Sequence, residues 1–355
     1  IVARQSLGSY KLKNSFVSLG GSKGKWNYYS FYQKKSREGW RPNSNTEAQT
    51  AFISAEYQAN SKLKLGLEYT HMDYLAQQPG GLDDANFASN PDTSFRSRNW
   101  FQVDWNIAAF NSRTFGLWAS RDALGILDTQ YVPDSVIMAL RPNRDLLTST
   151  FDNIGNETRL IHRYFIGEIE SALLVGLRFY KGFTVKNQGT ADSSSEANFS
   201  FENKLDNYGS QFKFPSFNKA FFIENLIRVN DCISLTPGFR YDHIVTQSEG
   251  YFHAVVNDSL HFTSSENKLD RDIFLAGLGG SYKCFVGGEL YANFSQNYRA
   301  INFNDMQVIN SNIVVDSELE DEKGFNIDLG LRGTVWGAIE YDVSLFYLDY
   351  SNRIG

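Results

Sequence analysis

Apolar and polar residues alternate along many segments of this chain of 355 residues. From Phe101 to Ala109 every odd position is apolar, and Gln102, Asp104 and Asn106 lie between them. The same alternation recurs in residues 62–70, 324–332 and 335–344. Because successive side chains of a β-strand point to opposite faces, each segment predicts a strand with one apolar face and one charged face.

A soluble antiparallel sheet also alternates, so the lengths of the strands and of their connections matter. The predicted strands are about 10–13 residues long, which matches the roughly 9–11 residues that cross a tilted bilayer. Strands of soluble proteins usually have about 5–6 residues. Trp and Tyr also recur near the strand ends, as in the aromatic girdles of membrane barrels. The sequence therefore predicts an all-β, antiparallel transmembrane β-barrel.

The predicted connections alternate between short and long, as in outer-membrane barrels with short periplasmic turns and long extracellular loops. The short connections lie near residues 20–25, 60–62, 109–113, 168–171, 230–232, 284–288 and 333–337. The long connections lie near residues 37–48, 75–97, 120–157, 182–215, 246–270 and 299–322. Loops of this length are uncommon inside a compact soluble domain.

This pattern gives fifteen strands, over residues 2–9, 12–19, 25–36, 48–58, 62–74, 97–107, 112–120, 157–168, 171–182, 216–229, 232–246, 270–283, 288–299, 322–333 and 336–350. An odd number does not close a bacterial barrel by the usual even rule, and an open edge in lipid leaves backbone groups unpaired. We therefore expect the sequence to continue beyond this segment.

Composition excludes some classes of protein and leaves others open. The net charge is -6 and the isoelectric point about 5.5, with no dense basic face, so nucleic acid is not an expected partner. No apolar run reaches the roughly 18 residues of a membrane helix. The mean hydropathy is -0.37, a value that alternating barrel strands also give. A soluble β-sandwich or propeller remains the alternative fold.

Several stretches resemble TonB-dependent transporters, and in particular the group of ferric-dicitrate receptors. They are RQSLGSYKLKNSFVSLGGSKGKWNYYSFYQKKSREGWRPNS (residues 4–44), YLAQQPGGLDDANFASNPDTSFRSRNWFQVDWN (74–106), ANFSQNYRAINFNDM (292–306), LEDEKGFNIDLGLRG (319–333) and YDVSLFYLDYSNRIG (341–355). The second stretch is the most specific to that group, and the fourth is shared widely across these barrels.

The resemblance implies a barrel of about 22 strands that is plugged by an N-terminal domain. Residues 1–355 then form a partial receptor barrel domain without the plug. The resemblance also implies a multi-pass protein of the outer membrane of a Gram-negative bacterium, in contact with membrane lipid and lipopolysaccharide. Its energy coupling is expected to come from the TonB–ExbB–ExbD complex, acting through the plug.

The function that the resemblance implies is active, TonB-coupled import of a ferric chelate, either ferric citrate or another ferric siderophore. A TonB-dependent importer of another cargo, such as cobalamin, haem or an oligosaccharide, and a passive porin-like barrel are the alternatives. We expect no enzyme activity, because the sequence contains no GxSxG or HExxH motif and its five His residues are scattered. No resident metal or cofactor is expected beyond the transported chelate.

An anionic chelate needs cations, and arginine binds carboxylates in a fork geometry. The candidate ligand-binding residues lie in or beside the predicted outer loops: Gln77, Gln78, Arg96, Arg98, Arg121, Arg141 and Arg144, with Arg159 and Arg163 nearby. The alternative for each arginine is a solvated loop charge or an ion pair inside the barrel. Such ion pairs are expected among the charged residues of the polar strand faces: Lys64, Glu68, Asp104, Arg178, Arg240, Asp328, Arg332, Glu340 and Asp342.

Overall fold

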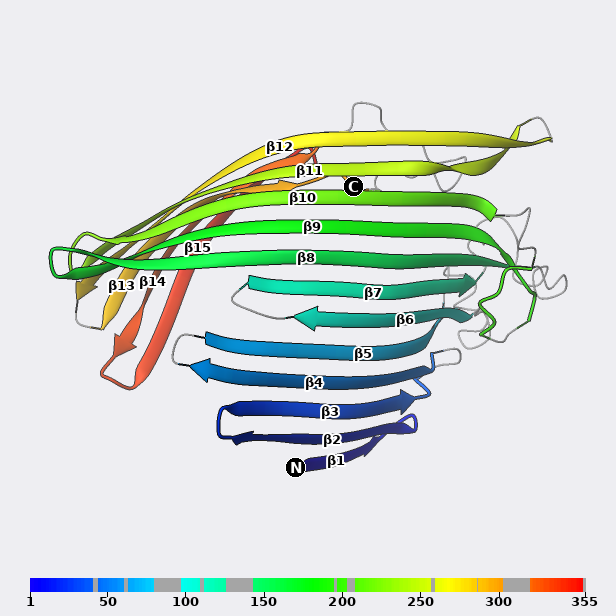
Figure 1. The fold of residues 1–355 in the computed structure, drawn as a ribbon, viewed down its shortest axis with the longest axis horizontal. Coiled ribbons are helices and arrows are strands. Elements are labelled where there is room, and N and C mark those ends of the chain that lie inside the picture. The colour runs from blue at the N-terminus through cyan, green and yellow to red at the C-terminus, as the bar shows by residue number, and fades with distance from the viewer. Residues whose placement is uncertain are drawn as a thin grey trace, which may run out of the picture. The chain divides into compact units, whose positions relative to one another are not determined.

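The computed structural model consists of β-strands joined by turns and loops (Figure 1). It describes residues 1–40, 44–60, 63–79, 97–108, 112–125, 143–194, 197–202, 208–256, 259–285, 287–302 and 320–353. Among these residues, no helix is long and apolar enough to span a membrane.

The described residues form fifteen strands: β1 (Val2–Gly8), β2 (Leu12–Lys23), β3 (Trp26–Arg37), β4 (Thr46–Asn60), β5 (Leu63–Pro79), β6 (Ser97–Ala108), β7 (Ser112–Gly125), β8 (Arg144–Ile166), β9 (Ile169–Ala191), β10 (Tyr208–Arg228), β11 (Ile233–Val256), β12 (Ser259–Phe285), β13 (Gly288–Arg299), β14 (Glu322–Val335) and β15 (Ile339–Ser351). They form one sheet in which each strand pairs with its neighbours in sequence. The pairs whose register is defined are antiparallel, as in β2–β3 and β14–β15. The all-β antiparallel prediction and the predicted order of strands are confirmed.

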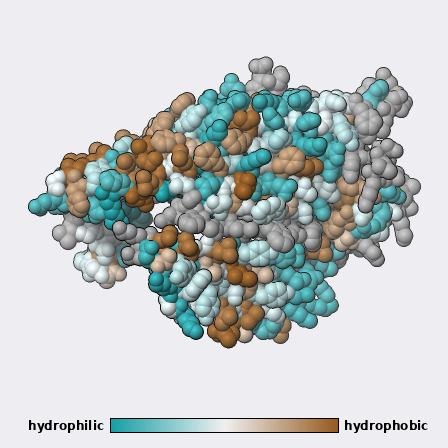
Figure 2. Space-filling model, viewed as in Figure 1, coloured by the Kyte–Doolittle hydropathy of each residue, from teal (hydrophilic) through white to brown (hydrophobic). Residues whose placement is uncertain are grey.

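The chain divides into two compact units, and β8 to β12 each contribute residues to both. Unit 1 comprises Ile1–Gly155, Gly182–Pro215 and Ser248–Asn267. Unit 2 comprises Asn156–Lys181, Ser216–Gln247 and Lys268–Gly355. Figure 2 shows hydrophobic side chains gathered over unit 2, near the ends of β8 to β12 at which short turns connect the strands.

Each unit exposes large hydrophobic side chains on one face of its strands, which we call the apolar face. In unit 1 these include Ile53, Leu67, Trp118 and Ile154, which are 43–55% exposed. A soluble protein rarely presents such a broad apolar surface to water. Intervening residues lie on the opposite side, the polar face, because side chains alternate along a strand.

Four of the charged residues that were predicted to form ion pairs do so on the polar face. Lys64 pairs with Glu56 at 2.7 Å, and Arg332 pairs with Glu289 at 2.8 Å. The other two pairs are Arg178 with Glu157 at 3.8 Å and Arg240 with Asp242 at 2.5 Å. The polar face is not uniformly polar, however, since Phe16, Phe31 and Phe52 form a ladder of rings with centroids 5.4–5.6 Å apart.

Within the described residues the short turns fall where the sequence predicts them, and glycine makes two of them possible. Gly24 between β2 and β3 and Gly337 between β14 and β15 have φ angles of 61° and 67°. This left-handed region is sterically open to glycine and disfavoured for residues with a Cβ atom. The strands can therefore reverse within a few residues.

The predicted outer ends of several strands are wrong, because the strands continue into the expected loops. β9 extends to Ala191, β10 begins at Tyr208, and β8 begins at Arg144, where loops 182–215 and 120–157 were expected. In the expected loop 246–270, β11 extends to Val256 and β12 begins at Ser259. The prediction limited each strand to the length that crosses a bilayer. Paired strands can continue beyond that length, because the ladder satisfies their backbone groups in water as well.

Candidate ligand-binding site

Two cations from separate strands lie on the polar face of unit 1. Arg121 is on β7, three residues from the exposed Trp118 of the apolar face, so the alternation places it on the polar face. Lys186 is on β9, three residues from the exposed Phe183, and the same argument applies. The Nζ atom of Lys186 lies 5.6 Å from the centroid of the Phe214 ring, within the range of a cation–π contact.

The environment of Lys186 disfavours its charged form. Burial lowers the pKa of the Lys186 ammonium, and the positive charge of Arg121 lowers it further. A pair of like charges in a partly dehydrated setting is stabilised by an anion that both can reach. Arg121 and Lys186 are therefore suited to hold a carboxylate or another anionic group.

The strand register brings two further predicted positions onto neighbouring strands. Gln78 of β5 and Arg98 of β6 are direct cross-strand partners. Arg121 of β7 is the partner of Gln102, which lies four residues after Arg98 on the same strand. Directly paired residues occupy the same face of an antiparallel sheet, and so do residues four apart on one strand. Positions 78, 98 and 121 therefore occupy the same face of β5 to β7, although they are far apart in sequence.

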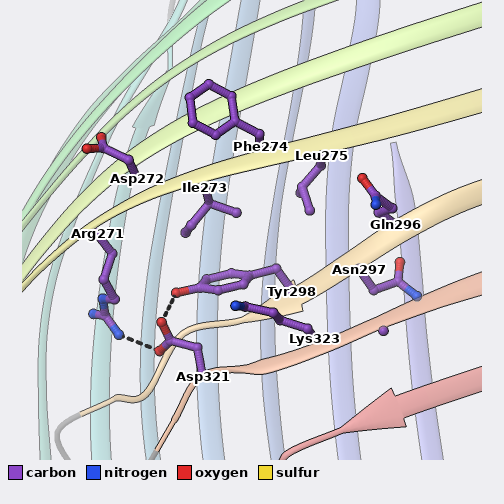
Figure 3. A pocket seen from close by; sticks show the side chains of 11 residues that line it. Arg271, Asp272, Ile273, Phe274, Leu275, Gln296, Asn297, Tyr298, Asp321 and Lys323 are labelled. Carbon is purple, nitrogen blue, oxygen red and sulfur yellow. Dashed lines mark hydrogen bonds and ion pairs between the residues drawn. The ribbon is translucent and has the colours of Figure 1, made fainter.

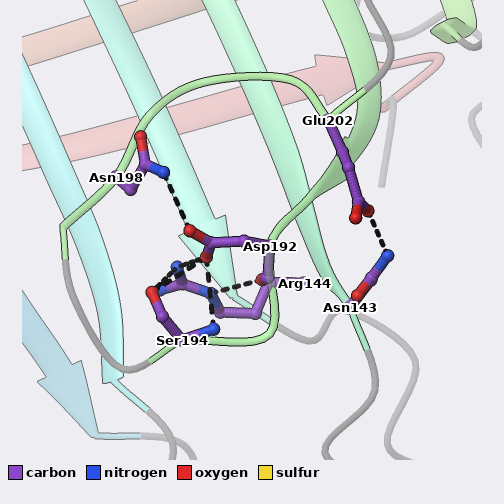
Figure 4. Close-up of polar contacts among 6 residues, drawn as sticks. All are labelled: Asn143, Arg144, Asp192, Ser194, Asn198 and Glu202. Carbon is purple, nitrogen blue, oxygen red and sulfur yellow. Dashed lines mark hydrogen bonds and ion pairs between the residues drawn. The ribbon is translucent and has the colours of Figure 1, made fainter.

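Arg144 has a different setting from Arg121. It is 7% exposed and its guanidinium binds Asp192, donating to the main-chain oxygen at 3.0 Å and to the carboxylate (Figure 4). A terminal nitrogen also donates to Ser194 Oγ at 3.1 Å. Asn198 donates to the same carboxylate at 2.8 Å, and Asn143 donates to Glu202.

These contacts hold residues 192–194 and 197–202 on the apolar face of β7 to β9. Arg144 is ten residues before the exposed Ile154 on β8, an even spacing that places both side chains on the same face. The buried cluster Leu124, Leu146 and Ala191 lies on that side, and Phe199 and Phe201 pack against it. Arg144 thus anchors a loop on the face opposite Arg121. Its assignment as a ligand residue stays a prediction. Its contacts with Asp192 and Ser194 also give it a structural role.

The other predicted residues are spread more widely. Gln77 is ten residues after the exposed Leu67 on β5, and this even spacing places its side chain on the apolar face. Its main-chain N–H donates to the main-chain oxygen of Asn45 at 2.8 Å. Arg159 pairs with Glu157, and Arg163 pairs with Glu170 at 3.1 Å near the short turn after β8. Arg96 and Arg141 lie outside the described residues.

Lys186 is the residue that the sequence prediction missed. It lay inside the expected loop 182–215, where charged residues are assumed to be solvated. The signal for a strand was present, since Leu177, Phe179, Phe183 and Val185 are apolar at odd positions of β9 on both sides of Lys181. Extending the alternation would have placed Lys186 on the polar face.

Across the described ranges, no group of three or more His, Cys, Asp or Glu side chains is arranged to hold a metal ion. The polar face of unit 1 offers charge and hydrogen bonds for the recognition of a ligand. Arginine and lysine on this face suit an anion, and Phe214 supplies an apolar surface beside Lys186.

Solved structures with a similar fold include several iron-chelate receptors. The ferric citrate transporter FecA in its unliganded form is 17% identical with a TM-score of 0.74, over 99% of this chain and 51% of that one. The ferric-catecholate import receptor Fiu from Escherichia coli K12 is 13% identical with a TM-score of 0.73, over 99% and 58%. The ferric yersiniabactin uptake receptor FyuA from Yersinia pestis is 12% identical with a TM-score of 0.68, over 97% and 53%.

The chain thus spans between half and three fifths of these receptors. No curated protein matches the sequence. A family model described as "TonB dependent receptor-like, beta-barrel" matches residues 5–355, which is nearly the whole chain. This chain belongs to the TonB-dependent receptor family and is part of its β-barrel domain.

Proposed function

We propose that this chain forms part of the wall of an outer-membrane transporter. The transporter imports a ferric chelate, and coupling to TonB supplies the energy for import. The family consists of transport receptors of the outer membrane. The apolar face would contact lipid, and the polar face would line the lumen. The structurally similar receptors for ferric citrate, catecholates and yersiniabactin support an iron chelate as the cargo class.

The observation that carries the proposal is the pair of cations formed by Arg121 and Lys186 on the polar face. Ferric citrate and carboxylate siderophores are anions, and charge-assisted hydrogen bonds from Arg and Lys are the strongest contacts a protein offers them. Burial and the charge of Arg121 lower the pKa of Lys186, and a bound anion would offset the cost of the charged form. Positions 78 and 98 would extend the same surface along β5 and β6.

The test is calorimetric titration of ferric citrate into the full-length receptor, purified from outer membranes in detergent. An Arg121→Ala/Lys186→Ala variant is expected to lose at least about a hundredfold in affinity, since each hydrogen bond to a charged group contributes about 1.5–3 kcal/mol. An Arg163→Ala/Lys283→Ala variant removes the same charge near the short turns and serves as the control.

Equal binding by the parent and the Arg121/Lys186 variant would remove this pair from the cargo site. Absence of ferric citrate binding by a folded parent would redirect the cargo assignment to other siderophores, cobalamin, haem or an oligosaccharide. Uptake that persists without the TonB–ExbB–ExbD complex would favour a passive porin-like barrel instead. An Arg96→Ala/Arg98→Ala variant tests whether these two predicted residues also contribute.

A further inference from the structure

The ladder between β12 and β13 ends before either strand does. Its last pair is Gly277 and Ser295, although both strands continue beyond that pair. A cavity of about 390 Å³ lies where the pairing stops. Residues 271–275 of β12 and residues 296–298 of β13 are in its lining, and all of them belong to unit 2. The sheet of unit 2 therefore contains a gap between two neighbouring strands, which we call the seam.

Main-chain groups of the two strands face each other across the seam. The Ala276 N–H points toward β13, because it donates to the side-chain oxygen of Gln296 at 2.8 Å. Main-chain groups alternate between the two edges of a strand, so those of Phe274 point the same way. A continued ladder would place Gln296 opposite Ala276 and Tyr298 opposite Phe274. The Gln296 side chain thus supplies the acceptor that its own main-chain oxygen would supply in that ladder.

Tyr298 is held inside the seam by a chain of hydrogen bonds. Its hydroxyl donates to the Asp321 carboxylate, and Figure 3 shows the ring turned toward that residue. Asp321 also accepts from Arg271 at 2.7 Å and from the Ile301 N–H at 2.8 Å. Arg271 is fixed in turn, because it donates to Thr246 Oγ1 at 2.6 Å. These bonds keep the Tyr298 side chain in the cavity and the seam open.

Main-chain pairing offers a second arrangement of the same residues. In a continued ladder Ala276 and Gln296 would exchange main-chain hydrogen bonds, and Phe274 and Tyr298 would do so too. The rings of Phe274 and Tyr298 would then be direct neighbours, and aromatic cross-strand pairs stabilise a sheet. Phe274 is 63% exposed and contacts Tyr241 at 5.0 Å between ring centroids. Its open side can therefore receive another ring.

The two arrangements exchange one set of hydrogen bonds for another. On closure Asp321 would lose the Tyr298 hydroxyl but keep its ion pair with Arg271. Gln296 is exposed, so water can replace the Ala276 N–H as the partner of its side chain. The net contribution of a single hydrogen bond is small, so such an exchange changes the free energy little. Elements with two discrete arrangements of similar free energy are the ones that switch.

We propose that the seam is a two-state element of the barrel wall. In the open state, which the structure shows, Tyr298 binds Asp321 and the cavity is present. In the closed state the ladder extends through Phe274 and Tyr298, and the cavity is lost. The seam thereby controls whether the wall can hold a small molecule between β12 and β13. It does not depend on which cargo is imported, because Arg121 and Lys186 belong to unit 1.

The experiment measures closure by disulfide formation in the full-length receptor, purified in detergent, with Cys232 and Cys284 replaced by serine. Leu275→Cys/Asn297→Cys places two thiols opposite each other in the closed ladder, at a pair without mutual hydrogen bonds, where side chains are close. Their disulfide should form slowly, because the open state dominates. Adding Tyr298→Phe removes the hydroxyl and keeps the ring. The rate is then expected to increase at least about tenfold, because hydrogen bonds to charged groups are among the stronger ones.

Gly279→Cys/Asn293→Cys is the matched control. These residues are direct partners in the existing ladder, and each is four positions from its counterpart in the test pair, on the same face. A Cβ atom at Gly279 would meet Thr236 Cβ at 3.5 Å, an ordinary contact. The control disulfide should form equally fast with and without Tyr298→Phe.

Amide exchange gives a second readout that needs no new cysteines. The Phe274 N–H gains a main-chain partner when the seam closes, so its exchange should slow at least about tenfold in Tyr298→Phe.

Two results would overturn the proposal. The first is a disulfide between positions 275 and 297 that forms equally slowly with and without Tyr298→Phe, while the control pair reacts fast. The second is fast and complete formation in both, which would show that the seam is closed at rest. If the cysteine variants do not fold, unchanged exchange of the Phe274 amide in Tyr298→Phe overturns the proposal by itself.

Discussion

The Arg144 guanidinium donates to the main-chain oxygen of Asp192 at 3.0 Å and also binds the carboxylate of that residue, 48 positions later in the chain. The arginine is buried, and the aspartate begins the loop that follows β9. One side chain therefore ties the start of β8 to the end of β9. The tie closes a loop that also packs Phe199 and Phe201 on the hydrophobic cluster beneath it.

Substitution Arg144→Ala is expected to release this loop without unfolding the strands. The carboxylate of Asp192 would keep its bonds to Ser194 and Asn198 but lose its connection to β8. Hydrogen exchange of the backbone amides in residues 197–202 should quicken by roughly tenfold, because hydrogen bonds to charged groups are among the stronger ones. Arg144→Lys should show an intermediate effect, since lysine keeps the charge and loses the fork. Unchanged exchange in Arg144→Ala would show that the apolar contacts alone hold the loop.

The same contacts make the loop sensitive to acid. Hydrogen bonds from Asn198, Arg144 and Ser194 hold the pKa of the Asp192 carboxyl far below its ordinary value of 3.8. A carboxyl with a lowered pKa stabilises the folded form fully above its ordinary pKa and progressively less below it. The protection factors of the amides in residues 197–202, which correct for the intrinsic pH dependence of exchange, should therefore be constant from pH 7 to pH 5 and fall as the pH drops below 3.8. Asp192→Asn should abolish this acid-dependent change, and a change that survives in that variant would place its origin elsewhere.

The short turns and the strands could be predicted from the sequence because their signals are local. Alternation needs about eight residues to be recognised, and a turn such as that at Gly24 needs one glycine at the right place. The outer ends of β8 to β12 could not be placed, because bilayer thickness was taken as a limit on strand length.

The sequence predicted only the part of the candidate site that follows from local patterns. Arg121 and the positions of Gln78 and Arg98 share one face, which follows from alternation and pairing once the strands are known. Arg144 was assigned to a loop, so its even spacing from Ile154 on β8 was not considered. The proximity of Arg121 to Lys186 depends on how β7, β8 and β9 are arranged side by side, and one sequence does not specify such a long-range relation.

Gly324 on β14 is required by the close approach of β15. A Cβ atom at this position would lie 2.1 Å from the main-chain oxygen of Asp349. Gly324→Ala should therefore force the two strands apart and lower the free energy of unfolding by about 1–3 kcal/mol. Gly66→Ala is the matched control, because its Cβ atom would meet nothing nearer than Glu56 Cγ at 3.9 Å. Thermal unfolding in detergent, followed by circular dichroism, should show a lower transition for Gly324→Ala alone. Equal transitions would contradict the steric argument.

The ion pair between Arg271 and Asp321 should matter more than the exposed pairs of unit 2. Their side chains are 12% and 15% exposed, and Asp321 also accepts from the Ile301 N–H. Asp321→Asn leaves the buried guanidinium without a counter-charge, which typically costs about 3–5 kcal/mol. Arg332→Ala breaks a pair whose arginine is 54% exposed, and about 0–1 kcal/mol is expected. Amide exchange in residues 299–302 should quicken in Asp321→Asn and stay unchanged in Arg332→Ala. The reverse order would show that burial does not decide the strength of these pairs.

Binding of an anionic chelate near Lys186 should be linked to proton uptake. Burial first, and the charge of Arg121 second, lower the pKa of this ammonium from its ordinary value of 10.5. A bound anion favours the protonated form and raises the pKa again, so affinity should increase as the pH falls through the lowered value and level off below it. Lys186→Arg keeps a charge that does not titrate in this range, and is expected to retain binding while losing the pH dependence. Calorimetric titrations of ferric citrate at several pH values between 7 and 10, in buffers of different ionisation enthalpy, measure both the affinity and the protons taken up. A pH dependence that is the same in the parent and in Lys186→Arg would exclude Lys186 as the linked group.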